Sequence, residues 1–200
     1  MSRSQSVEDY LKAIYKLESE EEGGVSNSRL ASEMEVSNAS VTNMVKRLSE
    51  MGMVDYESYY GSRLTTTGRK IALEIIRHHR LLELYLKEMM GYSWDEVHDE
   101  AEKLEHHISE QFGDKIAEML NHPAFDPHGD PIPTKEGEMP VMKTLSLNDA
   151  KMDIPCIISR VKDQEPEFLR YLEKMGLIPG VKLRVIEKEP FDGPITLVMA

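Results

Sequence analysis

The hydrophobic positions in the first two thirds of the chain recur mostly at helical spacing. Near the start, four apolar side chains share one helical face: Val7, Leu11, Ile14 and Tyr15. Ser6 and Asp9 have the spacing of a capping box, in which two side chains satisfy free N–H groups at a helix start. The sequence therefore predicts a first helix that begins near Ser6 and ends before the run EEEGG.

The next segment, NSRLASEMEVSNASVTNMVKRLSEMG, contains two short apolar periods separated by a break at residues 36–38. A short helix is predicted around Leu30, and a second helix is predicted to end at Gly52. Two β-rich stretches around Gly61, MVDYESYY and SRLTT, then predict a hairpin. Two helices followed by a hairpin indicate a winged helix-turn-helix.

The middle of the chain is predicted to be helical as well. Helical periodicity runs from Thr67 to Met90, and Gly91 ends it. A second capping box at Ser93–Glu96 predicts a helix that carries the segment HDEAEKLEHHISE. After Gly113 the helical pattern continues to Leu120 and then gives way to HPAFDPHGDPIPTKEGEMP, whose proline and glycine content is typical of a linker.

Short β-like runs dominate the remainder of the chain. CIISRV, KLRVIEKE and ITLVM surround one helical piece, EPEFLRYLEKMG, which indicates a small β-rich domain. The chain stops inside a strand-like run, which leaves open whether this domain is complete.

Composition narrows the classes of function without choosing among them. The net charge of −12 argues against loose binding to nucleic acid, although a local basic face can outweigh the total. The single cysteine, Cys156, excludes an internal disulfide framework and a cysteine-rich zinc site. The start lacks the apolar core of a signal peptide, and no stretch approaches the roughly 20 apolar residues of a membrane span. We therefore expect a cytoplasmic protein with no membrane partner.

The second helix of the helix-turn-helix has one apolar and one polar face. Val41, Val45 and Leu48 recur at spacings of four and three and are predicted to face the core. The opposite face carries side chains that pair with bases or phosphates: Ser40, Thr42, Asn43, Lys46 and Arg47. The candidate DNA contacts also include the helix cap Ser37, its neighbour Ala39, and Arg63 in the hairpin. Because any surface helix is polar outside, this helix alone leaves DNA binding open.

The segment HDEAEKLEHHISE holds five acids and three histidines. On a continuous helix Glu102, Glu105 and His106 would share one face, with His98 one turn earlier. A cation would relieve the repulsion among these acids. Carboxylates with imidazole suit Mn(II), Fe(II), Zn(II) or Co(II), and the preceding helix offers His79 and Glu83 four residues apart. The alternative is a solvated face with internal ion pairs.

Several segments together resemble one family. These are VEDYLKAIYKL, LTTTGRK, RHHRLLELYL, VHDEAEKLEHHIS, the HP…GDPIP linker and RYLEKMGLIPG. With them the whole chain is similar to the diphtheria toxin repressor family of metal-dependent transcriptional regulators. The resemblance implies a mainly α fold with a winged helix-turn-helix DNA-binding domain at 1–72 and a helical metal-binding and dimerisation domain at 73–140. A linker and a small β-rich SH3-like domain would follow at 141–200.

The resemblance also implies two metal positions. In the first, Asp9 would join Glu102, Glu105 and His106. Iron-responsive members carry Met and Cys where this chain has Asp9 and Glu102, and carboxylates there are similar to the manganese transport regulators. Lys12 stands where small manganese regulators carry a further acid, which argues against a two-metal cluster of their type.

The second implied position uses His79, Glu83 and His98. Larger manganese-type members are similar to this chain at Asp126, His128 and Asp163, which would assist. An ordinary Asp-Pro-His-Gly turn is the alternative explanation for Asp126 and His128, and a helix cap is the alternative for Asp163.

These inferences predict a homodimeric, Mn(II)-activated transcriptional repressor of metal-uptake genes that binds double-stranded palindromic operator DNA. Fe(II) is the alternative activating ion, and Zn(II), Co(II) or Cd(II) are expected to substitute in vitro. A winged-helix regulator that senses a non-metal ligand is a further alternative. A di-iron enzyme is disfavoured because no Glu lies three residues before His98, His106 or His107, so no enzyme activity is expected.

Overall fold

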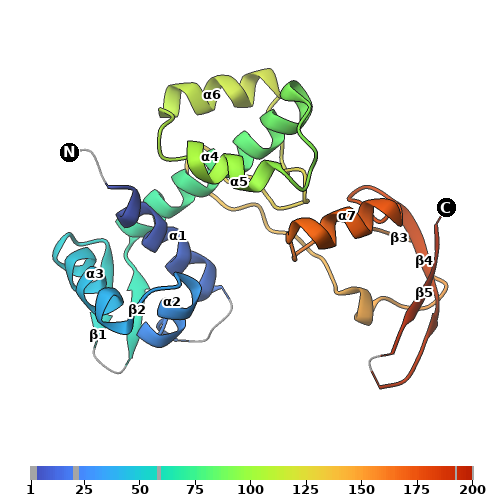
Figure 1. Ribbon diagram of the computed structural model, residues 1–200, viewed down its shortest axis with the longest axis horizontal. Coiled ribbons are helices and arrows are strands. Elements are labelled where there is room, and N and C mark those ends of the chain that lie inside the picture. The colour runs from blue at the N-terminus through green and yellow to red at the C-terminus, as the bar shows by residue number, and fades with distance from the viewer. Residues whose placement is uncertain (1–3, 20–22, 58–59, 192, 200) are drawn as a thin grey trace. The chain divides into compact units, whose positions relative to one another are not determined.

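The computed structural model describes residues 4–19, 23–57, 60–191 and 193–199 (Figure 1). The chain forms two compact units. The first unit comprises residues 1–78, 105–107 and 133–139. The second unit comprises residues 79–104, 108–132 and 140–200.

The first unit contains the helix-turn-helix that the sequence predicts. Its elements in chain order are α1 (Gln5–Glu18), α2 (Asn27–Glu33), α3 (Asn38–Glu50), β1 (Val54–Glu57), β2 (Gly61–Leu64) and the first half of α4 (Thr66–Met90). The capping-box prediction at the chain start is wrong. Helix α1 already begins at Gln5, and its N-cap, Ser4, makes no side-chain cap bond. The side chain of Asp9 therefore belongs to the body of the helix.

The core of the first unit is shared by its helices and its hairpin. Leu11, Ile14 and Leu17 supply one apolar face, and Val41, Val45 and Leu48 supply the other; all six are fully buried. Burying an aliphatic side chain of this size contributes about 1.5–3 kcal/mol, so this shared core stabilises the unit. Side-chain caps begin both short helices, because Ser26 accepts from the Arg29 N–H and Ser37 accepts from the Ser40 N–H.

The predicted hairpin is confirmed. Strands β1 and β2 pair antiparallel from Val54 opposite Leu64 to Glu57 opposite Gly61. Val25 adds a short bridge to Ser62 on the other side of β2. Gly61 has φ +87°, and a Cβ there would lie 2.6 Å from the Val25 carbonyl oxygen. Glycine is therefore required at this position for both backbone conformation and space.

The second unit begins with the remainder of α4 and continues with α5 (Val97–Leu104) and α6 (Glu110–Met119). The prediction of a long helix from Thr67 to Met90 agrees with α4 to one residue. The prediction of one helix through HDEAEKLEHHISE is wrong, because α5 ends at Leu104 and residues 105–107 form a turn.

A small antiparallel sheet and one helix form the C-terminal part of the second unit (Figure 1). Its elements are the short 3₁₀ helix η1 (Leu147–Asp149), β3 (Cys156–Ile157), α7 (Pro166–Lys174), β4 (Lys182–Lys188) and β5 (Ile195–Met199). Strand β4 lies in the middle and pairs with β3 and β5. The sequence-based prediction of a mainly α fold with a small β-rich C-terminal domain is confirmed.

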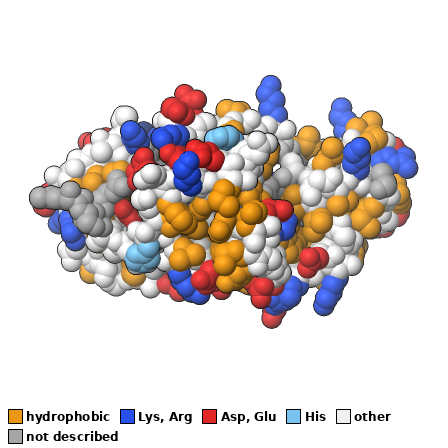
Figure 2. Space-filling view, turned by 90° about the horizontal axis from the view of Figure 1, so that it is seen from above, with side chains coloured by type: hydrophobic (Ala, Val, Ile, Leu, Met, Phe, Trp, Pro, Cys, Tyr) orange, Lys and Arg blue, Asp and Glu red, His pale blue; other side chains and the backbone are white. Residues whose placement is uncertain are grey.

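Among the described residues, no helix has the length and apolar content needed to cross a membrane. Figure 2 shows acidic and basic side chains interleaved on the face that it presents.

Candidate metal centres and nucleic-acid interface

The first cluster joins helix α1 to the turn that follows α5, within the first unit. Glu8 and Asp9 lie on α1, and Glu105 and His106 lie in the turn. Nδ1 of His106 lies 2.7 Å from Oε2 of Glu8. Its Nε2 lies 2.8 Å from Oδ1 of Asp9 and 3.2 Å from Oε1 of Glu105. A single imidazole therefore faces three carboxylates.

The electrostatics of this cluster favour a positive charge at its centre. Burial lowers the pKa of His106, but the carboxylates of Asp9, Glu105 and Glu8 outweigh burial and raise that pKa to about 10. A proton on the imidazole supplies the charge in the metal-free chain, and a divalent cation would supply it in place of the proton.

Buried polar atoms in the first cluster fit a metal ion. Oδ1 of Asp9 and Nε2 of His106 are buried, and their 2.8 Å contact lacks the geometry of a hydrogen bond. Such atoms cost free energy unless another group satisfies them. The ligand atoms of Asp9, Glu105 and His106 lie within 4.8 Å of one another, as the ligands of one ion would. Glu8 would accept the Nδ1 proton and leave Nε2 to the ion.

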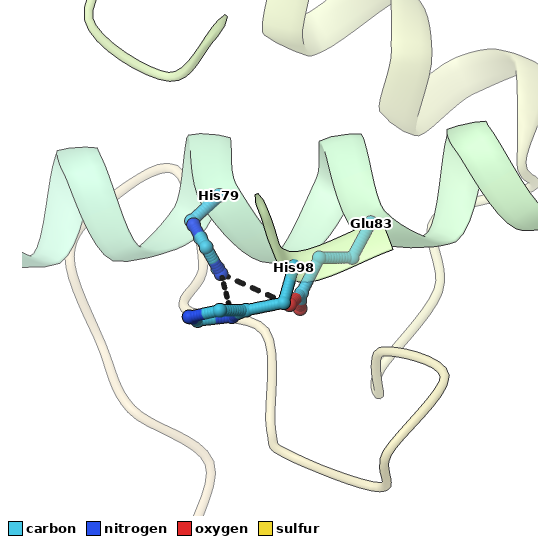
Figure 3. Close-up of side chains that lie close together, drawn as sticks. All are labelled: His79, Glu83 and His98. Atoms are coloured by element: carbon cyan, nitrogen blue, oxygen red, sulfur yellow. Dashed lines mark hydrogen bonds and ion pairs between the residues drawn. The ribbon is translucent and has the colours of Figure 1, made fainter. Parts of the chain in front are cut away.

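The second cluster lies wholly in the second unit, where α4 meets α5. His79 and Glu83 project from α4 toward His98 of α5 (Figure 3). Nε2 of His79 lies 2.9 Å from Oε1 of Glu83 and 3.1 Å from Nδ1 of His98. Nδ1 of His98 lies 3.2 Å from the same Glu83 oxygen. Burial raises the pKa of Glu83, but the imidazoles of His79, His98 and His128 outweigh burial and hold that pKa below its ordinary range.

His128 presents an unpaired nitrogen to the same carboxylate. It is fully buried, and its Nε2 lies 2.7 Å from the Trp94 carbonyl oxygen. Because a carbonyl only accepts, the proton of a neutral imidazole belongs on Nε2 and the lone pair on Nδ1. That Nδ1 has no hydrogen-bond partner and lies 3.8 Å from Oε1 of Glu83. A backbone carbonyl that fixes the tautomer in this way is typical of a metal-binding histidine.

Asp126 lies beside His128, and its side chain also stabilises the turn that contains both residues. Its Oδ1 accepts from the backbone N–H groups of His128 and Asp130. Burial, with the nearby charges of Glu83 and Asp130, raises the pKa of Asp126 to about 8. The ligand atoms of Glu83, Asp126 and His128 lie within 4.8 Å of one another, so this second group fits an ion as well as a turn.

Two predicted ligands have other surroundings. Glu102 belongs to the second unit, and its Oε2 lies 3.4 Å from Nδ1 of His79. The shared helical face predicted for Glu102, Glu105 and His106 is absent, because α5 ends before Glu105. Asp163 is exposed and accepts from the Glu165 N–H, which is a turn bond before α7; the N-cap of that helix is Glu165, so Asp163 is not the helix cap given above as its alternative. The structure does not bring Asp163 into either group of candidate ligands.

Sequence reasoning missed two acids that support these clusters. Glu8 is buried against His106. The sequence signal that could have identified it is its position four residues before Lys12, which places the two charged side chains on one face of the helix. Asp130 is buried as well, with Nε of Arg160 2.6 Å from its Oδ1 and Nε2 of Gln164 donating to its Oδ2 at 2.9 Å. No short-range pattern points to Asp130, because both partners lie thirty or more residues later.

The polar face of α3 is largely available to a partner. Ala39, Ser40, Asn43, Lys46 and Arg47 are exposed, and so is Arg63 on β2. Thr42 is half-buried, because its hydroxyl donates to the Asn38 carbonyl and accepts from the Asn27 amide. Ser37 caps α3. The face therefore presents amide and cationic groups that match base edges and phosphates.

Three family models match successive parts of the chain. The iron dependent repressor N-terminal DNA binding domain matches residues 3–62. The iron dependent repressor metal binding and dimerisation domain matches residues 65–134. The FeoA domain matches residues 145–199.

Similar proteins cover nearly the whole chain. The iron-dependent repressor IdeR of Mycobacterium leprae is 38% identical over 208 residues, which span 96% of this chain and 88% of that protein. A solved manganese-dependent transcriptional repressor in complex with manganese is 37% identical with a TM-score of 0.86, covering 96% of this chain and 89% of that one. The structure of ScaR with bound Zn²⁺ is 34% identical with a TM-score of 0.78, and the match covers 97% of this chain and 93% of that one.

Proposed function

The chain belongs to the diphtheria toxin repressor family of metal-dependent, DNA-binding transcriptional repressors, and from this premise we propose that Mn(II) is its activating ion. We further propose that it represses metal-uptake genes. The observation that carries the choice of metal is the donor set of the first cluster, Asp9, Glu105 and His106, which contains oxygen and nitrogen but no sulfur. Carboxylate oxygens suit Mn(II), whereas thiolate and thioether ligands favour softer ions.

Fe(II) is the second candidate, and one comparison favours it. The Mycobacterium leprae relative is by its name iron-dependent, and it matches nearly the full chain. Fe(II) also accepts carboxylate and imidazole ligands, so the donor set ranks the two ions without excluding iron. Zn(II), Co(II) and Cd(II) are expected to occupy the same clusters in vitro.

The proposed activation works through helix α1. Asp9 lies on a helix whose apolar face belongs to the same core as the apolar face of α3, and α3 carries the candidate DNA contacts. An ion held by Asp9, Glu105 and His106 would tie α1 to the turn after α5 and relieve the repulsion between these carboxylates. To move α1 from mostly loose to mostly ordered, the ion must favour the ordered state by roughly 3 to 5.5 kcal/mol, which is within reach of a multidentate site.

The proposed ligand is double-stranded operator DNA with a palindromic sequence, bound by a homodimer. A two-fold dimer presents two copies of α3, and such helices dock when they lie about 34–36 Å apart, one turn of DNA. Exposed apolar side chains in the second unit support self-association: Met89, Met90, Phe112 and Met119. Figure 2 shows hydrophobic side chains gathered in the middle of the face that it presents. The domain division at 1–72, 73–140 and 141–200 is part of this proposal.

A DNA-binding titration at one fixed salt concentration tests the proposal. Operator affinity is measured with Mn(II), with Fe(II) under anaerobic conditions, with Zn(II) and with a chelator. We expect tight binding with Mn(II), weaker binding with the other ions at equal free concentration, and weak binding with the chelator. Equal operator affinity with and without metal would overturn metal activation, and a higher affinity with Fe(II) would select the iron alternative.

A further inference from the structure

Glu18, the last residue of α1, connects that helix to the hairpin and to α4. Its Oε1 accepts from the Leu64 N–H of β2 at 2.6 Å, and its Oε2 forms an ion pair with Nη2 of Arg69 on α4. The side chain is only 11% exposed, so solvent screens these contacts weakly. An acid at the C-terminal end of a helix does not stabilise the helix itself, because the helix dipole is negative there. The contacts with the hairpin and α4 therefore account for an acid at this position.

The bond from Leu64 to Glu18 lies on the edge of β2 that faces away from β1. On this edge Ser62 exchanges two backbone bonds with Val25, with N···O distances of 2.9 and 2.8 Å. The N–H of Leu64, two residues later, points to the same side and donates to Glu18. Arg63 lies between these two anchored residues, and its side chain is exposed. The backbone that presents Arg63 is therefore held on both sides of this residue.

Apolar packing does not fill the space beside the contact between Glu18 and β2. A cavity of about 460 Å³ lies there, and its lining includes Tyr15 of α1 together with Arg63 and Leu64 of β2. The guanidinium group of Arg69 lies over the Tyr15 ring, 5.2 Å from its centroid, and is thereby also held against α1. Polar contacts centred on Glu18 therefore connect the end of α1 to β2 at this place.

We propose that Glu18 is a positioning residue for DNA binding, which fixes β2 so that Arg63 meets a phosphate of the DNA backbone. Glu18 itself does not touch the DNA, because phosphates repel a carboxylate. This inference rests on one part of the proposed function, the contact of Arg63 with DNA, and does not depend on which ion activates the chain.

The test is a double-mutant cycle between Glu18 and Arg63 in the full chain with Mn(II). The probe is a labelled duplex of random sequence, because phosphate contacts do not depend on base sequence. Arg63→Ala should weaken binding about three- to tenfold at 0.1 M salt and lower the slope of affinity against salt by about one. Glu18→Met should cause a similar loss in the wild type and no further loss in the Arg63→Ala chain.

The direction of the Glu18→Met effect separates positioning from simple electrostatics. Removing an acid from a chain with a net charge of −12 should by itself leave DNA binding unchanged or strengthen it. Glu33→Met is the matched control, since Glu33 forms an exposed ion pair with Lys16 on α1. This control should bind the duplex as tightly as the wild type or more tightly.

Two conservative variants isolate the bond to Leu64. Glu18→Gln loses the same charge as Glu18→Met but keeps an oxygen that can accept from the Leu64 N–H, so it should bind the duplex within about twofold of the wild type. Glu18→Asp keeps the charge but is one methylene shorter, so it should weaken binding; it also covers the case in which Glu18→Met fails to fold. Amide hydrogen exchange at Leu64 should be faster in Glu18→Met and Glu18→Asp than in Glu18→Gln.

The outcomes distinguish this inference from the proposed function. Folded Glu18→Met and Glu18→Asp chains that bind the duplex as the wild type does, or losses that add fully to that of Arg63→Ala, would overturn the role of Glu18 and leave DNA binding standing. A wild type that does not bind the duplex, or an Arg63→Ala chain with unchanged affinity and salt slope, would overturn the contact of Arg63 with DNA as well.

Discussion

His106 connects the two sides of the first cluster through its two ring nitrogens. Nδ1 contacts the buried Glu8, and Nε2 faces Asp9 and Glu105. Because Glu8 can accept the Nδ1 proton, it fixes the tautomer that leaves a lone pair for the ion. Glu8 therefore supports the ligand set without needing to touch the metal.

His106→Ala should weaken Mn(II)-dependent operator binding by at least about a hundredfold, because the nitrogen ligand at the centre of the cluster is lost. His107→Ala is the control, because it removes the imidazole of the next residue, which is exposed. Fluorescence anisotropy with labelled operator measures the effect, and sedimentation reports the oligomeric state. The first-cluster assignment fails if both variants keep the wild-type response to Mn(II).

His128→Gln should lower Mn(II) affinity at the second cluster by about ten- to a hundredfold while the chain stays folded. The glutamine amide can still donate to the Trp94 carbonyl, but it carries no lone pair at the position of Nδ1. Calorimetric titration measures binding, and His122→Gln at an exposed position is the control. Normal second-site binding in His128→Gln would favour the turn as the sole role of this segment.

The sequence was sufficient to select Glu105 and His106 as candidate ligands. It did not reveal that these two residues lie in a turn and not in a helix. HDEAEKLEHHISE contains no glycine or proline, so composition predicts a continuous helix. The signal for the break was Ser109, which caps α6 by accepting from the Phe112 N–H. A helix that starts after Ser109 leaves residues 105–107 to form a turn, and this turn presents His106 to Asp9.

Helix α3 is the element on which DNA recognition is expected to depend. Asn43→Ala should reduce discrimination between operator and random DNA, because an exposed amide that can pair with adenine is lost. Arg47→Ala should weaken binding to both DNAs and lower the slope of affinity against salt by about one, as expected for a phosphate contact. Titrations at several salt concentrations measure both effects.

Lys103→Ala is the control for these α3 variants, since it removes an exposed charge from α5. If all three variants bind operator and random DNA as the wild type does, α3 does not enter the groove.

Elements with a strong hydrophobic period were predictable from the sequence, whereas the conformation of the linker was not. Helix α4 was predicted within one residue because its apolar positions recur over 25 residues and Gly91 ends it with φ +76°. The linker has no period, and its shape depends on partners distant in sequence. The Val161 N–H donates to the His128 carbonyl, and Arg160 pairs with Asp130. Tertiary contacts of this kind leave no local pattern.

Gly129→Ala should lower the thermal midpoint substantially, with about 3 kcal/mol or more lost from the stability of the second unit. Gly129 has φ +90°, and an added Cβ would lie 1.9 Å from the Ser159 carbonyl oxygen. Gly137→Ala is a matched control, because Gly137 has a similar φ of +81° but its nearest neighbour is a Leu73 methyl at 4.0 Å. Equal midpoints for the two variants, measured by circular dichroism, would mean that the approach to Ser159 does not matter.

The whole molecule carries a net charge of −12, which repels the phosphates of the proposed DNA ligand. The exposed cations Lys46, Arg47 and Arg63 are local exceptions in the first unit. Bound divalent ions reduce the negative charge, but the Debye length is only about 8 Å at physiological salt, so remote charges contribute little at the DNA surface. We therefore infer that ordering of α1, rather than neutralisation, accounts for most of the metal response.

Asp9→Ala separates these two explanations, because it removes the ligand on α1 and keeps Glu105 and His106. The variant should still bind Mn(II), about ten- to a hundredfold more weakly, and should respond poorly in operator binding even when saturated with the ion. Amide hydrogen exchange across residues 7–17 gives a second measurement. Exchange there should slow when Mn(II) is added to the wild type, and much less in the variant. Full operator binding by the saturated variant, or metal-independent exchange in the wild type, would mean that the ion acts without tying α1 to the turn after α5.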